Sequence, residues 1–289
     1  GTVWSVKVRR AKDGKVVFTA RTSKSAVDVD NLEIACDYKW RVKGVVDGAP
    51  LRAEGTFRTE DLAPRLIHLS RIHNMRDLGG RVGLNGRRVR QGRVYRSAGL
   101  NDNARKSKSK GGMVPGKERL TDAARAYAKG KLGIRTDLDL RSDRECFGMT
   151  GSPLGPEVKW IKISSSAYSG MAKDPGKSAF AQVFRVFLDE KNYPIDFHCI
   201  AGADRTGSLA FILNGLLGVD EEELWRDWEV TAFQKEKLDF GHRTRFSKLV
   251  KVFDAFPGAN INEKIVAYVK SAGFTDADIE KFRAIMLEP

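Results

Sequence analysis

The sequence predicts two domains of different class: a small all-β, sandwich-like domain at residues 1–62 and an α/β domain at residues 63–289. Two observations predict this division. Near the N-terminus, short segments such as "KVVFTAR" and "DYKWRVKGVV" alternate apolar and polar residues between Asp-Gly and Gly-Ala-Pro turns. Further along, strand patterns alternate with helical patterns, which is typical of a central, largely parallel sheet flanked by helices. We expect the first domain to be incomplete at its N-terminus, with roughly two leading strands absent.

The elements of the second domain follow from apolar periodicity and helix-capping residues. Strands are predicted at residues 134–141, 158–164 and 195–199. Helices are predicted at residues 118–131, 178–190 and 206–218, and throughout the C-terminal tail from residue 221. The last helix is expected to begin at the capping pattern Thr275-x-x-Asp278.

Charge and apolar content restrict the class of partner. The chain has 289 residues, with 51 Lys and Arg against 37 Asp and Glu, and a formal net charge of +14, which favours anionic partners. We find no zinc-finger spacing, no basic helix with heptads and no aromatic RNA-binding motif, so no specific nucleic-acid partner is predicted. No apolar run is long enough to predict a transmembrane segment.

One segment, residues 104–119, concentrates basic residues among glycines and serines. It is read as a solvated loop, with a substrate-facing basic lip as the alternative.

The three cysteines, Cys36, Cys146 and Cys199, have unrelated spacings. They form neither a disulfide framework nor a set of metal ligands, and we expect no metal and no cofactor. If Cys199 is catalytic, it must remain a free thiol.

The segment "DFHCIAGADRTG" at residues 196–207 lies between a predicted strand and a predicted helix. Unpaired backbone N–H groups and the helix dipole favour an anion in such a loop. Gly202 allows the backbone to curl, Gly207 allows close helix packing, and Arg205 can bind two phosphate oxygens. In this positive field Cys199 should have a lowered pKa and act as an in-line nucleophile toward a phosphoryl group. The alternative is an inert buried cysteine.

The same segment fits the signature H-C-x-x-G-x-x-R-[ST] of the cysteine-based protein-tyrosine-phosphatase superfamily. Four further stretches resemble the bacterial tyrosine phosphatase family 3, over about residues 65–289: "NMRDLGG" (74–80), "VRQGRVYRSAGL" (89–100), "IRTDLDLRSDRE" (134–145) and "DWEVTAF" (227–233). In the first domain, "YKWRV" and "GTFRTE" resemble the last strands of a fibronectin type III module. The presence of such a module favours an exported bacterial protein.

The family resemblance implies a role for each residue of the loop. Cys199 resembles the nucleophile, Arg205 the phosphate-binding arginine and Asp204 the proposed general acid. Thr206 would hydrogen-bond the thiolate, and His198 would brace the loop from behind. The phosphate cradle would be formed by the N–H groups of Ile200, Ala201, Gly202, Ala203, Asp204 and Arg205.

Two acidic residues remain open to more than one interpretation. Asp204 could act as the acid or only stabilise the loop through hydrogen bonds. Asp174, in "AKDPGKS", is a rival acid on a segment that could close over substrate, although an ordinary acid at a helix start is the favoured interpretation.

Buried charges near the loop are expected to form a framework of salt bridges and hydrogen bonds, because buried charges need partners. The residues concerned are Arg76, Asp77, Asp139, Arg141 and Glu145. Alternatively, Arg76, Arg96 and Arg141 could supply positive charge to the site, and of these Arg96 and Arg141 could face the pocket.

The expected function is metal-independent hydrolysis of phosphate monoesters through a cysteinyl-phosphate, by a protein-tyrosine or dual-specificity phosphatase. An inositol phosphate or phosphoinositide phosphatase of the same mechanism is the alternative. Relatives active on phosphoinositides tend to carry lysine where this chain has Ala203. A non-catalytic module that binds a phosphate ligand is a second alternative. The expected partner is a phosphotyrosine protein, an anionic small molecule or a lipid head group, and no oligomeric state is predicted.

Overall fold

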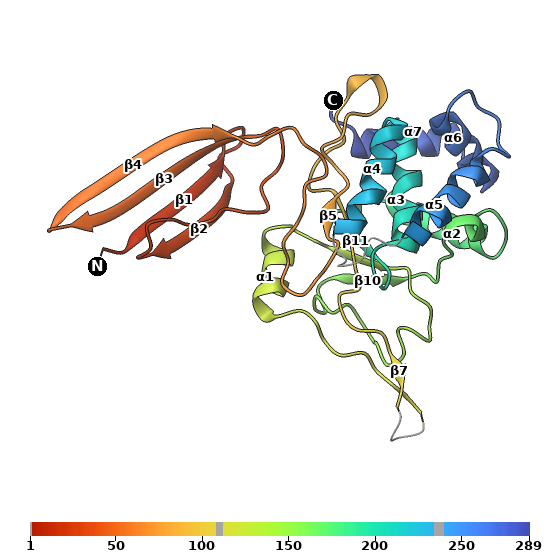
Figure 1. The fold of residues 1–289 in the computed structure, drawn as a ribbon, viewed down its shortest axis with the longest axis horizontal. Coiled ribbons are helices and arrows are strands. Elements are labelled where there is room, and N and C mark those ends of the chain that lie inside the picture. The colour runs from red at the N-terminus through yellow and green to blue at the C-terminus, as the bar shows by residue number, and fades with distance from the viewer. Residues whose placement is uncertain (1, 108–111, 234–239) are drawn as a thin grey trace.

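The computed structural model describes residues 2–107, 112–233 and 240–289 (Figure 1). The N-terminal strands form a sheet that projects to one side of a larger body of strands and helices (Figure 1). Residues 108–111 of the basic segment and residues 234–239 of the C-terminal tail lie outside the described residues.

The N-terminal part is one antiparallel sheet with the strand order β2-β1-β3-β4. Its strands are β1 (Trp4–Arg10), β2 (Val16–Thr22), β3 (Asp37–Val46) and β4 (Ala49–Arg58). Asp47 and Gly48, both at positive φ, connect β3 to β4 as a two-residue hairpin turn requires. In the described part of residues 1–62 this sheet is single, so the two packed sheets expected of a sandwich are not seen. Val29, Leu32 and Cys36 cover part of its apolar face instead.

The sheet of the second part has the order β10-β9-β11-β6-β5. Its strands are β5 (Arg76–Asp77), β6 (Val94–Ser97), β9 (Thr136–Asp139), β10 (Lys159–Lys162) and β11 (Ile195–His198). Four strands are parallel, and only β5 runs antiparallel to its neighbour β6. The three strands predicted at residues 134–141, 158–164 and 195–199 are confirmed, with shorter bounds. His198 pairs with both Ser97 and Asp139, so three strands end together where the Cys199 loop begins.

Helices surround this sheet (Figure 1). Their bounds are α1 (Asp122–Gly130), α2 (Gly176–Phe187), α3 (Asp204–Leu216), α4 (Glu221–Phe233), α5 (Phe240–Phe253), α6 (Ile261–Ser271) and α7 (Asp276–Met286). The predicted capping box is confirmed, because the Thr275 hydroxyl accepts from Asp278 N–H while the Asp278 carboxylate accepts from Thr275 N–H. Short elements complete the chain: the 3-10 helices η1 (Leu84–Gly86), η2 (Tyr168–Met171) and η3 (Glu190–Asn192), and the hairpin of β7 (Arg105–Lys106) and β8 (Met113–Val114).

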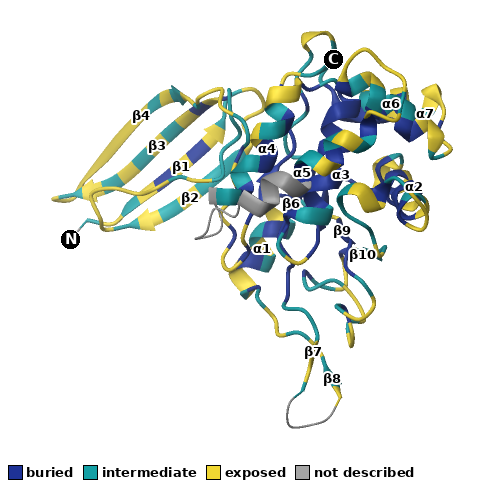
Figure 2. Ribbon diagram, turned by 45° about the vertical axis from the view of Figure 1, so that its right-hand side comes forward, coloured by how far each residue is buried: buried dark blue, intermediate teal, exposed yellow. Residues whose placement is uncertain are grey.

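Helix α3 is the centre of the core (Figure 2). Every residue from Thr206 to Leu216 is buried, as expected for a helix that is apolar on nearly all sides. The helix that follows the Cys199 loop is therefore held on all sides by packing. Among the described residues no helix is both long enough and apolar enough to cross a bilayer.

The two parts are joined by polar contacts at the segment that precedes β3. The Gln91 amide accepts from Ile34 N–H and donates to Ile34 O, both at 2.9 Å. Asn31 makes the equivalent pair with the backbone of His68, at 2.6 and 3.0 Å. These four hydrogen bonds attach the N-terminal sheet through its connecting segment and leave its strands projecting.

Candidate active site

The loop after β11 has its carbonyl groups turned outward. Three of them accept hydrogen bonds from earlier segments: Ile200 O from Gly99 N–H at 3.0 Å, Ala201 O from Asn74 Nδ2 at 3.1 Å, and Gly202 O from Arg96 Nη2 at 2.7 Å. In the described chain no backbone carbonyl accepts from the N–H groups of residues 200–203. Because the carbonyls are bonded from outside and these N–H groups have no backbone acceptor, we infer that the N–H groups are available to an anion, as in an anion-binding nest.

Glycine is required where this loop packs against β6. Gly202 has φ +65°, and a Cβ at this position would lie 2.5 Å from Ser97 O. Gly207, one turn into α3, approaches α4, where a Cβ would lie 3.2 Å from Trp228 Cδ1. Both glycines predicted from the sequence thus lie at close contacts, and Gly202 also meets the conformational requirement.

Cys199 lies at the base of the loop with 2% of its surface exposed. Burial raises the pKa of its thiol, but hydrogen bonds from the Thr206 hydroxyl and N–H, the charge of Arg205 and the Gly202 N–H outweigh burial and hold the pKa below its ordinary value. Thr206 Oγ1 is buried and has no hydrogen-bond partner at normal distance and angle among the described residues. We therefore assign the Cys199 sulfur as the acceptor of its hydroxyl hydrogen. The predicted lowering of the Cys199 pKa is confirmed.

Arg205 is oriented by Glu145. Its Nη1 and Nη2 atoms donate to the two carboxylate oxygens at 2.8 and 2.9 Å. Ser142 donates to the same carboxylate from its N–H at 2.7 Å and from its hydroxyl at 2.8 Å. Although burial raises the pKa of Glu145, these bonds from Arg205 and Ser142 lower it to about 2, so the carboxylate is ionised. The guanidinium is therefore held in one plane beside the loop, a role for Glu145 more specific than the predicted framework role.

Asp204, the first residue of α3, accepts a hydrogen bond from a tyrosine that the sequence did not single out. Tyr168 Oη donates to Asp204 Oδ1 at 2.5 Å. Tyr168 N–H also donates to Ser208 Oγ at 3.0 Å, so η2 is fastened to the first turn of α3 at two points. The stretch "SSSAYSG" around Tyr168 has neither a capping pattern nor apolar periodicity, and no local signal could have identified this contact.

Asp174 lies just before α2 and caps its first turn. Its Oδ1 accepts from Ser178 N–H at 3.1 Å and from Ser178 Oγ at 2.5 Å. These hydrogen bonds lower the pKa of the Asp174 carboxyl, which is the opposite of what a proton donor needs. The structure supports the interpretation of Asp174 as an acid at a helix start.

Three buried arginines surround one carboxylate behind the loop. Asp227, on α4, accepts from Arg76 Nε at 3.0 Å, from Arg81 Nη2 at 3.1 Å and from Arg96 Nη1. Burial lowers the pKa of Arg96, and the charge of Arg76 lowers it further. Arg81 Nε also lies 3.7 Å from a Glu223 oxygen, so three cations face two carboxylates. The cluster therefore leaves one positive charge next to the loop, where Arg96 also donates to Gly202 O.

A second buried cluster lies beneath β11. His198 Nε2 is 2.8 Å from Asp137 Oδ1, and its Nδ1 is 3.3 Å from Cys199 O. Burial lowers the pKa of His198, but the charges of Asp139 and Asp137 overcome burial and raise the pKa to about 9. A charged imidazolium at this position joins the loop to β9, in agreement with a bracing position behind the loop.

The expectation that Arg96 and Arg141 could face the pocket is wrong. Both guanidiniums are fully buried. Arg141 Nη2 donates to Asp139 Oδ2 at 2.6 Å, and Arg96 donates to the Asp227 carboxylate and to Gly202 O. Desolvation explains this outcome, because a buried cation must be neutralised by the nearest carboxylate. The framework role is confirmed for Asp77, which accepts from Gly79 N–H, Gly92 N–H and Arg65.

The residues in and next to the loop differ in exposure and charge. Ala203 is fully buried, whereas Ile200 is 41% exposed. The basic segment begins beside the site, because Ala104 N–H donates to Glu145 O at 2.9 Å before the chain enters β7. On β7, the side chains of Arg105 and Lys106 are exposed.

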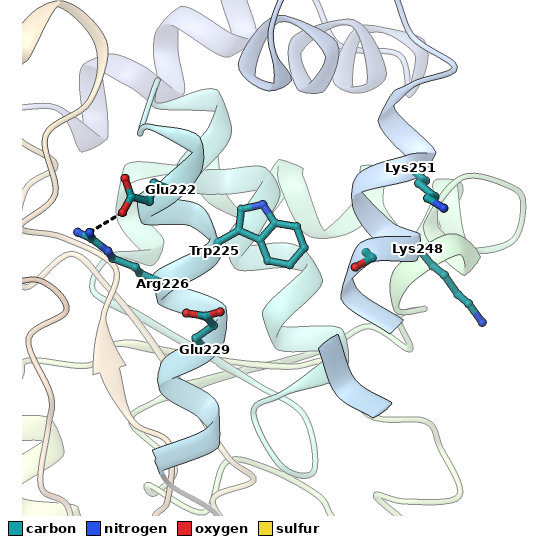
Figure 3. Close-up of a pocket in the computed structure, with 7 residues that line it drawn as sticks. Glu222, Trp225, Arg226, Glu229, Lys248 and Lys251 are labelled. Carbon is teal, nitrogen blue, oxygen red and sulfur yellow. Dashed lines mark hydrogen bonds and ion pairs between the residues drawn. The ribbon is translucent and has the colours of Figure 1, made fainter. Parts of the chain in front are cut away.

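A pocket of about 690 Å³ lies between α4 and α5 and is separate from the Cys199 loop (Figure 3). Trp225 points into it, with Glu222 and Arg226 on one side and Lys248 and Lys251 on the other (Figure 3). No residue of the Cys199 loop lines this pocket. In the described part of the chain, no group of three or more His, Cys, Asp and Glu side chains could hold a metal ion.

Comparison with known sequences identifies the family. A sequence model described as the tyrosine phosphatase family matches residues 67–110 and 116–288. This chain belongs to the tyrosine phosphatase family. The match includes the Cys199 loop, Glu145 and Asp227, and it excludes the N-terminal sheet. The resemblance of that sheet to a fibronectin type III module therefore stays a prediction.

Two relatives carry names of the same family. A protein from Cupriavidus necator, named as a candidate tyrosine-protein phosphatase, is 30% identical over 177 residues, which cover 53% of this chain and 58% of that protein. A tyrosine-protein phosphatase from Nostoc commune is 28% identical over 138 residues, covering 41% and 47%. The chain thus spans about half the length of these relatives.

A search of solved structures matches phosphatase catalytic domains, at low identity and low TM-score. The core catalytic domain of the PP-IP phosphatase SIW14 from S. cerevisiae, in complex with citrate, has 15% identity and a TM-score of 0.34, covering 61% of this chain and 80% of that one. P. aeruginosa TpbA has 17% identity and a TM-score of 0.35, covering 62% and 87%.

Proposed function

We propose that this chain hydrolyses phosphate monoesters, without a metal ion, through a cysteinyl-phosphate formed on Cys199. The observation that carries the proposal is a buried cysteine at the base of a loop whose carbonyl groups are bonded from outside, while Thr206 and the Gly202 N–H contact the sulfur. A tetrahedral dianion bound to the N–H groups of the loop and to Arg205 would have its phosphorus in line with the Cys199 sulfur.

The reaction has two steps in this proposal. First the thiolate forms an S–P bond as the ester P–O bond breaks, and Asp204 gives its proton to the departing oxygen. A water molecule then attacks the phosphorus, gives a proton to the Asp204 carboxylate, and releases phosphate while the thiolate leaves. Arg205, kept in plane by Glu145, balances the charge of the equatorial oxygens in both steps. Thr206 stabilises the thiolate whenever it is free.

The proposed substrate is phosphotyrosine in a protein. The exposed side chain of Ile200 offers an apolar contact for an aromatic ring next to the phosphate cradle. Ala203 is buried, and Arg96 and Arg141 point inward, so the loop itself supplies no second exposed cation for a multiply phosphorylated ring. One observation favours the alternative, an inositol phosphate or phosphoinositide: Arg105 and Lys106 are exposed on the hairpin that begins beside Glu145.

Turnover of a phosphotyrosine peptide and of inositol phosphates in the presence of EDTA tests the reaction and the substrate class together. We expect EDTA to have no effect and the peptide to be the better substrate. Cys199→Ser should lower kcat by at least about 10³-fold. The matched control is Cys36→Ser, which changes a buried cysteine of the N-terminal sheet and should leave kcat unchanged.

Full activity in Cys199→Ser, or activity lost to EDTA, would contradict the proposed reaction. Binding of phosphate esters without turnover of any substrate would instead identify a non-catalytic binding module.

A further inference from the structure

The N-terminal sheet has one face on which basic side chains gather. Strand alternation places the odd-numbered residues of β1 and β3 and the even-numbered residues of β4 on this face, together with Thr19 and Arg21 of β2. It holds eight of the twelve Lys and Arg residues of the first 60 positions but only two of the eight Asp and Glu residues. We call it the basic face. Within the described residues, five of its cations form no ion pair: Lys7, Arg9, Arg21, Lys39 and Lys43.

Several of these cations lie directly opposite one another across strands. The register pairs Lys7 with Arg41, Arg9 with Lys39, and Lys43 with Arg52. Glu54 contacts Arg41 at 3.3 Å and Arg52 at 2.5 Å, and Asp37 pairs with Arg58. Both acidic residues of the basic face therefore already form ion pairs with other arginines. Like charges placed opposite each other destabilise a sheet. An anionic partner bound to this face would offset the repulsion between the cations.

The shape of the basic face suits a broad anionic surface. A groove of about 320 Å³ on this face is lined mainly by charged and polar residues, namely Lys7, Arg9, Lys39, Arg41, Glu54 and Thr56, together with Trp40 and Gly55. The aromatic side chains of the central strands, Tyr38, Trp40 and Phe57, alternate onto the opposite face. Of the residues that line the groove, only Trp40 is aromatic, and strand alternation directs its ring to the opposite face, so the basic face presents charged side chains in place of the stacking rings that single-stranded nucleic-acid binders use.

We propose that the basic face docks the protein on membranes rich in anionic phospholipids. Four strands about 4.8 Å apart present the cations over an area of several lipid head groups. Each Lys or Arg close to an anionic bilayer strengthens binding about fivefold, and this attraction requires neither an apolar insertion nor a specific pocket. The proposal does not depend on the activity of the Cys199 loop, since it concerns only the N-terminal sheet.

Sedimentation of the full chain with lipid vesicles tests the proposal. The probes are vesicles of phosphatidylcholine alone and of phosphatidylcholine mixed equally with phosphatidylglycerol. We expect binding only to the mixed vesicles, and weaker binding as salt is added. The variant Lys7→Gln/Lys39→Gln should bind about 25-fold more weakly. The control Lys191→Gln/Lys281→Gln removes the same charge from exposed positions of the α/β part and should bind within twofold of the unaltered protein.

Thermal unfolding and phosphate ester hydrolysis report on the fold of both variants. Because Lys7→Gln/Lys39→Gln removes repulsion across the sheet, its melting temperature should not fall, and its hydrolysis in solution should be unchanged. The proposal is overturned if the two double variants lose binding equally, or if the unaltered protein ignores the mixed vesicles. Binding to a single-stranded RNA at protein concentrations that leave vesicles unbound would also overturn it.

Discussion

At the scale of single residues, the reactivity proposed for Cys199 depends on groups within seven positions along the chain and on residues that are distant in sequence. Thr206, Arg205 and the Gly202 N–H lower the pKa of its thiol directly. Glu145 orients Arg205. Tyr168 likewise contacts Asp204 from outside the loop, so we assign Tyr168 to positioning and Asp204 to proton transfer.

The effect of Tyr168 should depend on the leaving group. Tyr168→Phe removes the hydrogen bond to Asp204, and we expect kcat to fall about tenfold on an alkyl phosphate and little on para-nitrophenyl phosphate, whose leaving group needs no proton. Asp204→Asn should lower kcat by about 10²–10⁴-fold on the alkyl phosphate, and it should also slow phosphate release from para-nitrophenyl phosphate, because Asp204 activates the water of the second step.

Asp174→Asn is the control for these variants, because Asp174 caps α2, and it should retain full kcat on both substrates. A larger loss in Asp174→Asn than in Asp204→Asn would reverse the assignment of the acid. The rate of Cys199 alkylation should be unchanged in Tyr168→Phe.

At the scale of elements, the unit β11, loop and α3 works because its backbone fits against β6. The loop carbonyls are held from outside, and Gly202 leaves no room for a side chain above Ser97. Burial of α3 on all sides then fixes the N-terminus of the helix at the loop.

Replacement of Gly202 by alanine should therefore lower the free energy of unfolding by more than the strain of a positive φ alone would. Gly86 is the matched control: its φ is +73°, close to +65° at Gly202, but a Cβ there meets nothing within 4 Å. We expect Gly86→Ala to lower the free energy of unfolding by about 1 kcal/mol with kcat/KM unchanged. Gly202→Ala should cost more and abolish turnover, as measured by urea unfolding and steady-state kinetics. Equal costs in the two variants, with Gly202→Ala fully active, would show that the close approach to Ser97 is unimportant.

Some of these features can be predicted from the sequence and others cannot, and the reason is physical. The strand-loop-helix unit around Cys199 and the Thr275 capping box are predictable because all their interacting residues are neighbours along the chain. The contact between Tyr168 and Asp204 spans 36 positions and leaves no periodic pattern. The cluster of Arg76, Arg81 and Asp227 is also nonlocal, and the family-like stretches that contain Arg76 and Asp227 do not show that these two residues meet. Alternation predicted β-strands at the N-terminus, but it cannot distinguish a single sheet from a sandwich, because either has one apolar face.

At the scale of the whole molecule, the net charge of +14 is unevenly placed. One part of the surplus lies buried around Asp227, next to the loop, and another lies on the basic face of the N-terminal sheet. Beneath the sheet of the α/β part, the buried charge is instead balanced, because Asp137 and Asp139 face the two cations His198 and Arg141. Export from a bacterial cell stays a prediction, because no described feature bears on it.

The buried imidazolium should make stability depend on pH. The pKa of His198 is raised from an ordinary value near 6.5 to about 9, so the folded protein keeps a proton that the unfolded chain loses. This contribution to stability is present below about pH 6.5 and is lost as the pH rises through about 9, and it amounts to no more than about 3 kcal/mol. We expect the free energy of unfolding in urea to decline from pH 7 to pH 9.

The measurement is best made in a Cys199→Ser background, because ionisation of a thiol with a lowered pKa acts in the opposite direction over this range. In that background His198→Gln should flatten the decline. An unchanged slope in His198→Gln would show that His198 is neutral in the folded protein.

The central claim is that the phosphoryl group passes through the sulfur of Cys199. Trapping of the intermediate tests it most directly, in Asp204→Asn, where the good leaving group of para-nitrophenyl phosphate still departs but the activation of water is impaired. After rapid quenching and proteolysis, mass spectrometry should find one phosphoryl group on the peptide that contains Cys199, and none in Cys199→Ser. Release of phosphate by Asp204→Asn at the unaltered rate, with no phosphoryl group on Cys199 at any time, would contradict the claim.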